Sequence, residues 1–168
     1  YKIMKILIIV SSLTTLFFSC GFYSFTGASI SNDIKTVSIK YFPNNAKIIQ
    51  PTLSTVLTEK LKEQFITQTN LKIIDLDGDL SFNGEIIEYK IKPVGISSNE
   101  TATQNRLTIK VKVDFVNHKE NIRSYNATFS RYKDFSSNDN LTAIEEELIR
   151  DITEQLVEDI FNKALVNW

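Results

Sequence analysis

The segment Arg106-Leu-Thr-Ile-Lys-Val-Lys-Val-Asp-Phe115 decides the fold of this chain. Apolar side chains stand at every second position, and polar or charged side chains fill the positions between them. A period of two is typical of a β-strand that buries one face and leaves the other in water. We therefore expect a sheet with one covered face and one solvated face.

Similar patterns predict strands on both sides of this segment. Residues 34–41 alternate, and so do residues 80–86, 87–93 and 125–132. At Ile86-Ile87 the alternation slips by one residue, which predicts a β-bulge. Three further predictions are a short strand at 71–76, a hairpin turn at Asp77-Gly78 and a polar loop over 94–105.

Two other segments carry apolar side chains at the spacing of an amphipathic helix. One begins at Pro51 and runs past Phe65, and the other runs from Thr142 to the end of the chain. Thr142 and Glu145 have the spacing of a capping box. The order strand, helix, strands, helix predicts an α+β two-layer sandwich. We expect a mixed or antiparallel four-stranded sheet with two helices packed on one face.

The first twenty residues are typical of a bacterial lipoprotein signal. Lys2 and Lys5 precede a short apolar run that ends at Ser19-Cys20, and Cys20 is the only cysteine. The run is too short to favour a membrane span. We expect residues 1–19 to be a cleaved signal peptide read from Met4, Cys20 to be acylated (palmitate included), residues 20–32 to be a lipidated tether, and residues 33–168 to form one domain.

Charge and composition argue against several functions. The formal net charge is −1, whereas a nucleic-acid-binding domain needs a basic patch. His118 is the only histidine and lies in a polar turn. No Gly-x-Ser-x-Gly motif and no clustered metal ligands occur in the sequence. We expect no enzyme activity, no metal and no cofactor.

Two groups of residues are candidates for contact with other molecules. Basic side chains on the predicted strands form either an ordinary solvated face or a surface for an anionic, phosphorylated ligand; they are Lys90, Lys92, Lys110, Lys112, Arg131 and Lys133. A second apolar stripe on the last helix, together with tether aromatics, forms either a partner surface or part of the core. Its residues are Phe22, Tyr23, Phe25, Val157, Phe161, Leu165 and Trp168.

Much of the chain resembles a known family. The resemblance is carried by Ser-Cys-Gly-Phe-Tyr-Ser-Phe-Thr-Gly at 19–27, the strand at 34–41, Pro-Thr-Leu-Ser-Thr-Val-Leu at 51–57, and residues 78–89. Over these stretches the chain resembles a divergent branch of the LptE family of lipopolysaccharide-assembly lipoproteins.

The resemblance implies a function at the cell outer membrane. It implies a non-enzymatic domain that is held by its lipid on the periplasmic side, plugs an LptD-like β-barrel and helps that barrel assemble. Lipopolysaccharide is then an expected ligand, and the six basic residues are candidates for contacting it. The alternative is a stand-alone periplasmic lipid- or ligand-binding lipoprotein, or an accessory of another envelope machine.

Overall fold

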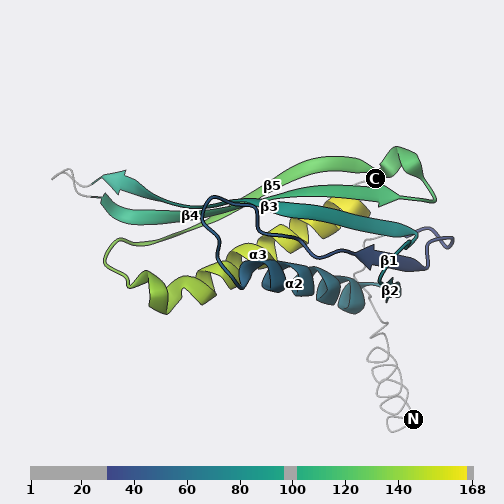
Figure 1. Cartoon of the computed structure of the whole chain (residues 1–168), viewed down its shortest axis with the longest axis horizontal. Helices are drawn as coiled ribbons and strands as arrows, with labels where there is room; N and C mark the ends of the chain where they lie inside the picture. The colour runs from purple at the N-terminus through teal and green to yellow at the C-terminus, as the bar shows by residue number, and fades with distance from the viewer. Residues whose placement is uncertain (1–29, 97–101, 166–168) are drawn as a thin grey trace, which may run out of the picture.

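The computed structural model describes residues 30–96 and 102–165 of the chain (Figure 1). Their elements follow in the order β1 (Thr36–Ile39), α2 (Leu53–Gln68), β2 (Lys72–Ile74), β3 (Leu80–Ile96), β4 (Ala102–Asn117), the 3-10 turn η2 (Asn121–Arg123), β5 (Tyr125–Ser136) and α3 (Leu141–Leu165). Figure 1 shows both helices on one side of the sheet. The α+β two-layer sandwich expected from the sequence is therefore confirmed. None of the described helices is long and apolar enough to cross a bilayer.

The sheet has five strands, in the order β2-β1-β3-β4-β5, and not the expected four. The short strand predicted at 71–76 is confirmed as β2, the fifth strand, which pairs in parallel with β1 because α2 returns the chain to the start of that strand. β1 also pairs in parallel with β3, whereas β3, β4 and β5 are antiparallel. The sheet is therefore mixed.

The predicted hairpin turn at Asp77-Gly78 is wrong. Because β2 and β3 lie on opposite sides of β1, the segment between them crosses β1 instead of reversing direction beside it. Asp77 has a positive φ of 55°. A Cβ on Gly78 would stand 2.5 Å from the backbone nitrogen of Ser38, so only glycine fits this close crossing.

The β3–β4 hairpin is longer than the sequence indicates. The predicted bulge is present between Ile86 and Glu88. The predicted polar loop is wrong over most of its length, since strand pairing continues through Val94 opposite Gln104 and Ile96 opposite Ala102. Thr103, Gln104 and Asn105, which suggested a loop, belong to β4, because backbone pairing holds a hairpin together even where side chains are polar; residues 97–101 lie outside the described residues.

The core lies between the sheet and the helices. The rings of Phe65, Phe82 and Phe115 are fully buried there, and the centroids of Phe65 and Phe82 are 5.1 Å apart. The predicted capping box is wrong: the side chain of Asn140 accepts the N–H of Thr142 at 3.1 Å and caps α3 in its place.

Candidate functional site

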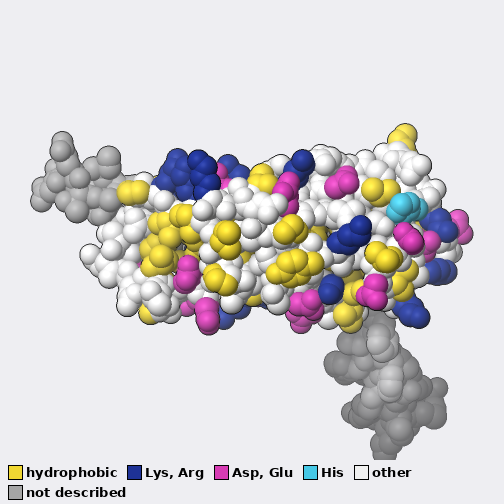
Figure 2. Space-filling model, viewed as in Figure 1, with side chains coloured by type: hydrophobic (Ala, Val, Ile, Leu, Met, Phe, Trp, Pro, Cys, Tyr) yellow, Lys and Arg dark blue, Asp and Glu magenta, His cyan; other side chains and the backbone are white. Residues whose placement is uncertain are grey.

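The strands β3 and β4 place four of the predicted basic residues on one surface. Lys90, Lys92, Lys110 and Lys112 alternate with residues that face the helices, so their side chains lie on the opposite, helix-free side of the sheet, which we call the open face. Figure 2 shows Lys and Arg side chains gathered near the end of the hairpin at which β3 finishes and β4 begins.

The structure adds Arg106, which sequence reasoning missed, to this group. Arg106 stands directly opposite Lys92 in the strand register. Its Nε and Nη2 donate hydrogen bonds of 2.7 and 2.8 Å to the carboxylate of Asp134, and its guanidinium lies 3.7 Å from the centre of the Tyr132 ring. Hydrogen bonding to Arg106 lowers the pKa of Asp134. The sequence could have shown this, because Arg106 stands four residues before Lys110 and therefore lies on the same face of the strand.

Lys90, Lys92, Arg106 and Lys110 form what we call the cationic cluster. Lys110 is paired with Glu88 at 3.2 Å. Among the described residues neither Lys90 nor Lys92 forms a salt bridge, and the charge of Lys92 is the main reason that the pKa of Lys90 is lowered, against a smaller opposing effect of Glu88. Like charges on neighbouring positions of a sheet repel one another. An anion bound between them would relieve that repulsion.

The other two predicted basic residues lie elsewhere. Arg131 and Lys133 are on the helix side of β5, where Arg131 forms two 2.6 Å hydrogen bonds with Asp159 and Lys133 bonds Asp151 at 3.0 Å. Grouping them with the open face is therefore wrong. Their phase along the strand is that of the inward-facing Tyr125, which the sequence already shows.

The predicted apolar stripe of the last helix is mostly core. Val157, Phe161 and Leu165 are 3%, 6% and 0% exposed, because α3 packs against both the sheet and α2 and so needs a wide apolar arc. The prediction of an exposed partner surface is wrong for these three. Trp168, the aromatics Phe22, Tyr23 and Phe25, and the lipidation candidate Cys20 lie outside the described residues.

The only histidine of the chain contacts a serine at the start of β3. Nε2 of His118 lies 3.1 Å from Oγ of Ser81, whose hydroxyl also bonds Ser38 at 2.9 Å. His118 is exposed in the turn after β4. Over residues 30–96 and 102–165 there is no group of three His, Cys, Asp or Glu side chains that could hold a metal ion.

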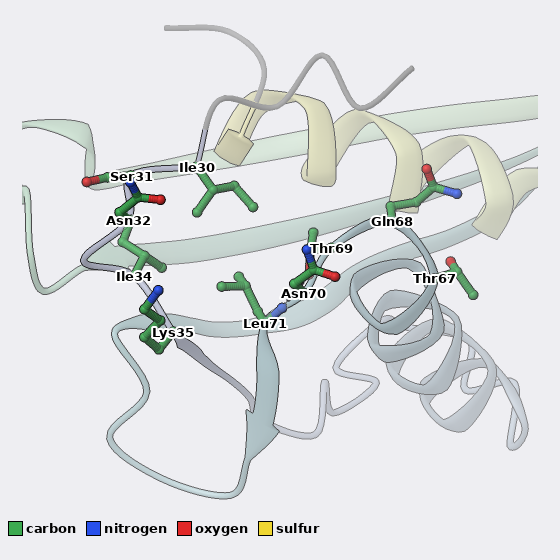
Figure 3. A pocket seen from close by; sticks show the side chains of 10 residues that line it. All are labelled: Ile30, Ser31, Asn32, Ile34, Lys35, Thr67, Gln68, Thr69, Asn70 and Leu71. Carbon is green, nitrogen blue, oxygen red and sulfur yellow. Dashed lines mark hydrogen bonds between the residues drawn. The ribbon is translucent and has the colours of Figure 1, made fainter. Parts of the chain in front are cut away.

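A cleft of about 430 Å³ opens at the end of α2. Figure 3 shows it between the loop at the start of the described chain and the segment that leads from α2 into β2. Hydroxyl and amide groups form much of its wall, and Lys35 is the only charged side chain among the described residues that line it. Its residues are Ile30, Ser31, Asn32, Ile34, Lys35, Thr67, Gln68, Thr69, Asn70 and Leu71.

Comparison with known proteins assigns the chain to a family. The LptE family model, described as lipopolysaccharide-assembly, matches residues 34–164, which include all of the described strands and helices except the last residue of α3. The chain belongs to the LptE family. No curated protein sequence matches it. The LptE family is non-enzymatic, and membership places the chain among lipopolysaccharide-assembly lipoproteins.

Several solved structures are similar to this chain at low sequence identity. A protein from Xanthomonas campestris is 11% identical, with 83% of this chain and 90% of that chain covered and a TM-score of 0.50. The rare lipoprotein B of Shewanella oneidensis is 12% identical, with 77% and 90% covered and a TM-score of 0.44. Lipoprotein B of Nitrosomonas europaea is 15% identical, with 76% and 79% covered and a TM-score of 0.46. The match to the Xanthomonas protein supports the two-layer fold.

Proposed function

We propose that this protein is an outer-membrane lipoprotein that plugs an LptD-like β-barrel, helps the barrel to assemble, and takes part in lipopolysaccharide transport and insertion. The observation that carries the proposal is the LptE family match over residues 34–164. It is supported by the signal-like segment that ends at Cys20.

The N-terminus supplies the attachment in this proposal. Acylated Cys20 anchors the chain to the inner leaflet of the outer membrane, and the tether at 20–32 lets the domain reach its barrel. One acyl chain gives only marginal binding, so durable attachment requires a multiply acylated cysteine.

The cationic cluster is the proposed contact for lipopolysaccharide. Phosphate groups bind well to clustered Lys and Arg side chains, and Lys90 and Lys92 form no salt bridge among the described residues. Lys112 extends the same face toward the middle of β4. Arg131 and Lys133 are no longer candidates, because they lie on the helix side of β5, away from the open face, and pair there with Asp159 and Asp151.

The cleft beside α2 is the one observation that favours the stand-alone alternative. Its volume is in the range that holds a small ligand. Lys35 is the only charged side chain that the described residues contribute to its wall, so this part of the wall offers little to a lipid with several phosphates. The family match therefore outweighs it.

Co-purification separates the two functions. The protein, tagged at its C-terminus, is extracted from membranes in mild detergent and its partners are identified by mass spectrometry. The proposal expects one large β-barrel protein at one-to-one stoichiometry. Recovery of the tagged protein without a barrel, from membranes in which the barrel is present, would favour the stand-alone alternative.

A further inference from the structure

The sheet has two long free edges, and they are protected differently. Along β3, pairing with the β1 side ends where Asn44 meets Ile86, and none of the described residues covers the outer edge beyond that point. That uncovered stretch carries a bulge, then Lys90, Lys92 and Pro93. Bulges, lysines and proline are the features that discourage an edge from pairing with another strand.

Between Tyr125 and Ser130 the outer edge of β5 has none of these features. Its 12 residues pair with β4 in an unbroken register and contain neither proline nor glycine. From Tyr125 to Ser130 the strand carries no charge. Within the part of the chain that the structure describes, nothing pairs with this edge, which Figure 1 shows along one side of the sheet. A long, regular, bare edge is a template for another strand.

The backbone groups that β5 presents outward follow from the register. Ile86 exchanges hydrogen bonds with Pro43 and Asn45, so the neighbouring Glu85 turns its backbone toward Lys112 of β4. Since backbone direction alternates along a strand, Val111 and Val113 turn toward β5.

The same alternation continues into β5. Ala127 and Phe129, which stand opposite Val113 and Val111, use their N–H and C=O groups on β4. Asn126, Thr128 and Ser130 therefore direct theirs away from the sheet.

We propose that β5 pairs antiparallel with β5 of a second copy of this chain, with Thr128 opposite Thr128. This register is self-complementary. It sets Ala127 against Phe129 and Asn126 against Ser130, with no like charges opposed between residues 125 and 131. It also sets Arg131 against Tyr125 of the second copy, a cation–aromatic pair.

The helices beneath the strands add charge complementarity. Asp159 is bound to Arg131, and Lys163 lies 5.0 Å from the centre of the Tyr125 ring. In the proposed register the Asp159 carboxylate of one copy therefore approaches the Lys163 ammonium of the other, and this happens twice across the two-fold axis. The dimer is a state of the free protein, so it goes beyond the proposed function and does not rest on it.

Cysteine cross-linking tests both the pairing and its register. In a Cys20→Ala background, Thr128→Cys places two thiols on directly opposed residues about 5.5 Å apart between Cα atoms, within disulfide range. We expect disulfide-linked dimers under mild oxidation. Ser130→Cys, two residues away on the same edge, opposes Asn126 and is the control. A mixture of Asn126→Cys and Ser130→Cys proteins should link again.

A proline variant tests the edge without relying on new thiols. The N–H of Thr128 faces outward, so Thr128→Pro removes a donor from the edge and no bond to β4. We expect sedimentation of the Cys20→Ala protein to change from a concentration-dependent dimer to a monomer, with the circular dichroism spectrum retained. Equal cross-linking at residues 128 and 130 would overturn the proposal. So would a Cys20→Ala protein, with Thr128 intact, that sediments as a monomer at every concentration.

Discussion

The hydroxyl of Tyr89 donates a 2.5 Å hydrogen bond to the carboxylate of Glu145, joining the far half of β3 to the start of α3. Tyr89 is 4% exposed. Burial, and then the Glu145 charge, raise the pKa of Tyr89 well above its usual value. This contact occupies the carboxylate that the sequence suggested as part of a helix cap.

Tyr89→Phe should lower the free energy of unfolding by about 1–2 kcal/mol, because it removes a buried hydrogen bond to a charged group. Since the folded-state pKa is raised, the bond stabilises the protein below pH ~10 and is lost as pH rises above it. Urea unfolding at pH 7 and pH 11 measures both effects. Tyr132→Phe, at a half-exposed position, is the control. The expectation would be contradicted if Tyr89→Phe were as stable as the wild-type protein and lost as much stability between pH 7 and pH 11.

Asp79 should make the fold acid-sensitive. Its carboxylate accepts the backbone N–H of Lys35 at 2.8 Å and of Thr36 at 3.0 Å and pairs with Lys119. The hydrogen bond from Lys35 is the main cause that lowers the pKa of Asp79 to about 2. Because this pKa is depressed, the stabilisation is complete above pH ~4 and is lost as pH falls toward 2.

Asp79→Asn should therefore destabilise the protein by about 1–3 kcal/mol at pH 7 and by less at pH 3. Urea midpoints at the two pH values measure the difference, with the exposed Asp77→Asn as control. A deficit that does not shrink in acid would show that the carboxylate charge is not responsible.

Phe161→Ala should cost about 3–5 kcal/mol, the range for truncating a buried aromatic side chain. The ring of Phe161 packs edge-on to Phe65 with 5.1 Å between centroids. Ile66→Ala, at a position that is 64% exposed on α2, should change stability little. Thermal melting of both variants measures this. A Phe161→Ala protein of nearly unchanged stability would show that the side chain is not part of the core.

Reversing charge in the cationic cluster should weaken lipopolysaccharide binding. Lys90→Glu with Lys92→Glu removes the two lysines that form no salt bridge among the described residues, and we expect about tenfold weaker binding, equivalent to ~1.4 kcal/mol. Wild-type binding should also weaken as salt rises, because exposed charges are screened. Lys47→Glu with Lys72→Glu makes the same charge change at exposed positions outside the cluster. Equal affinity of both double variants would leave the cluster as ordinary solvated sheet.

The periodic parts of the fold could be predicted from the sequence. Alternation found β1, β3, β4 and β5, and helical spacing found α2 and α3, because each buries one face against the other layer. The same alternation also assigns the charged residues to faces. It places Arg131 on the side of Tyr125, which faces the helices, and Arg106 on the side of Lys110, which is the open face.

Features that depend on distant segments could not be predicted in this way. The crossing at Gly78 requires β1 to lie between β2 and β3, which no local pattern records. The burial of Phe161 requires α3 to contact α2 as well as the sheet. The capping box failed for a similar reason, since Glu145 bonds Tyr89, 56 residues away.

The most direct test of the central claim is the amount of newly made lipopolysaccharide at the cell surface after this protein is depleted from its native host. Surface lipopolysaccharide is measured by protection from, or labelling with, a reagent that cannot cross the outer membrane. Function in lipopolysaccharide assembly predicts that the surface fraction falls as the protein disappears and recovers when it is expressed again. Normal surface lipopolysaccharide in fully depleted cells would contradict the account.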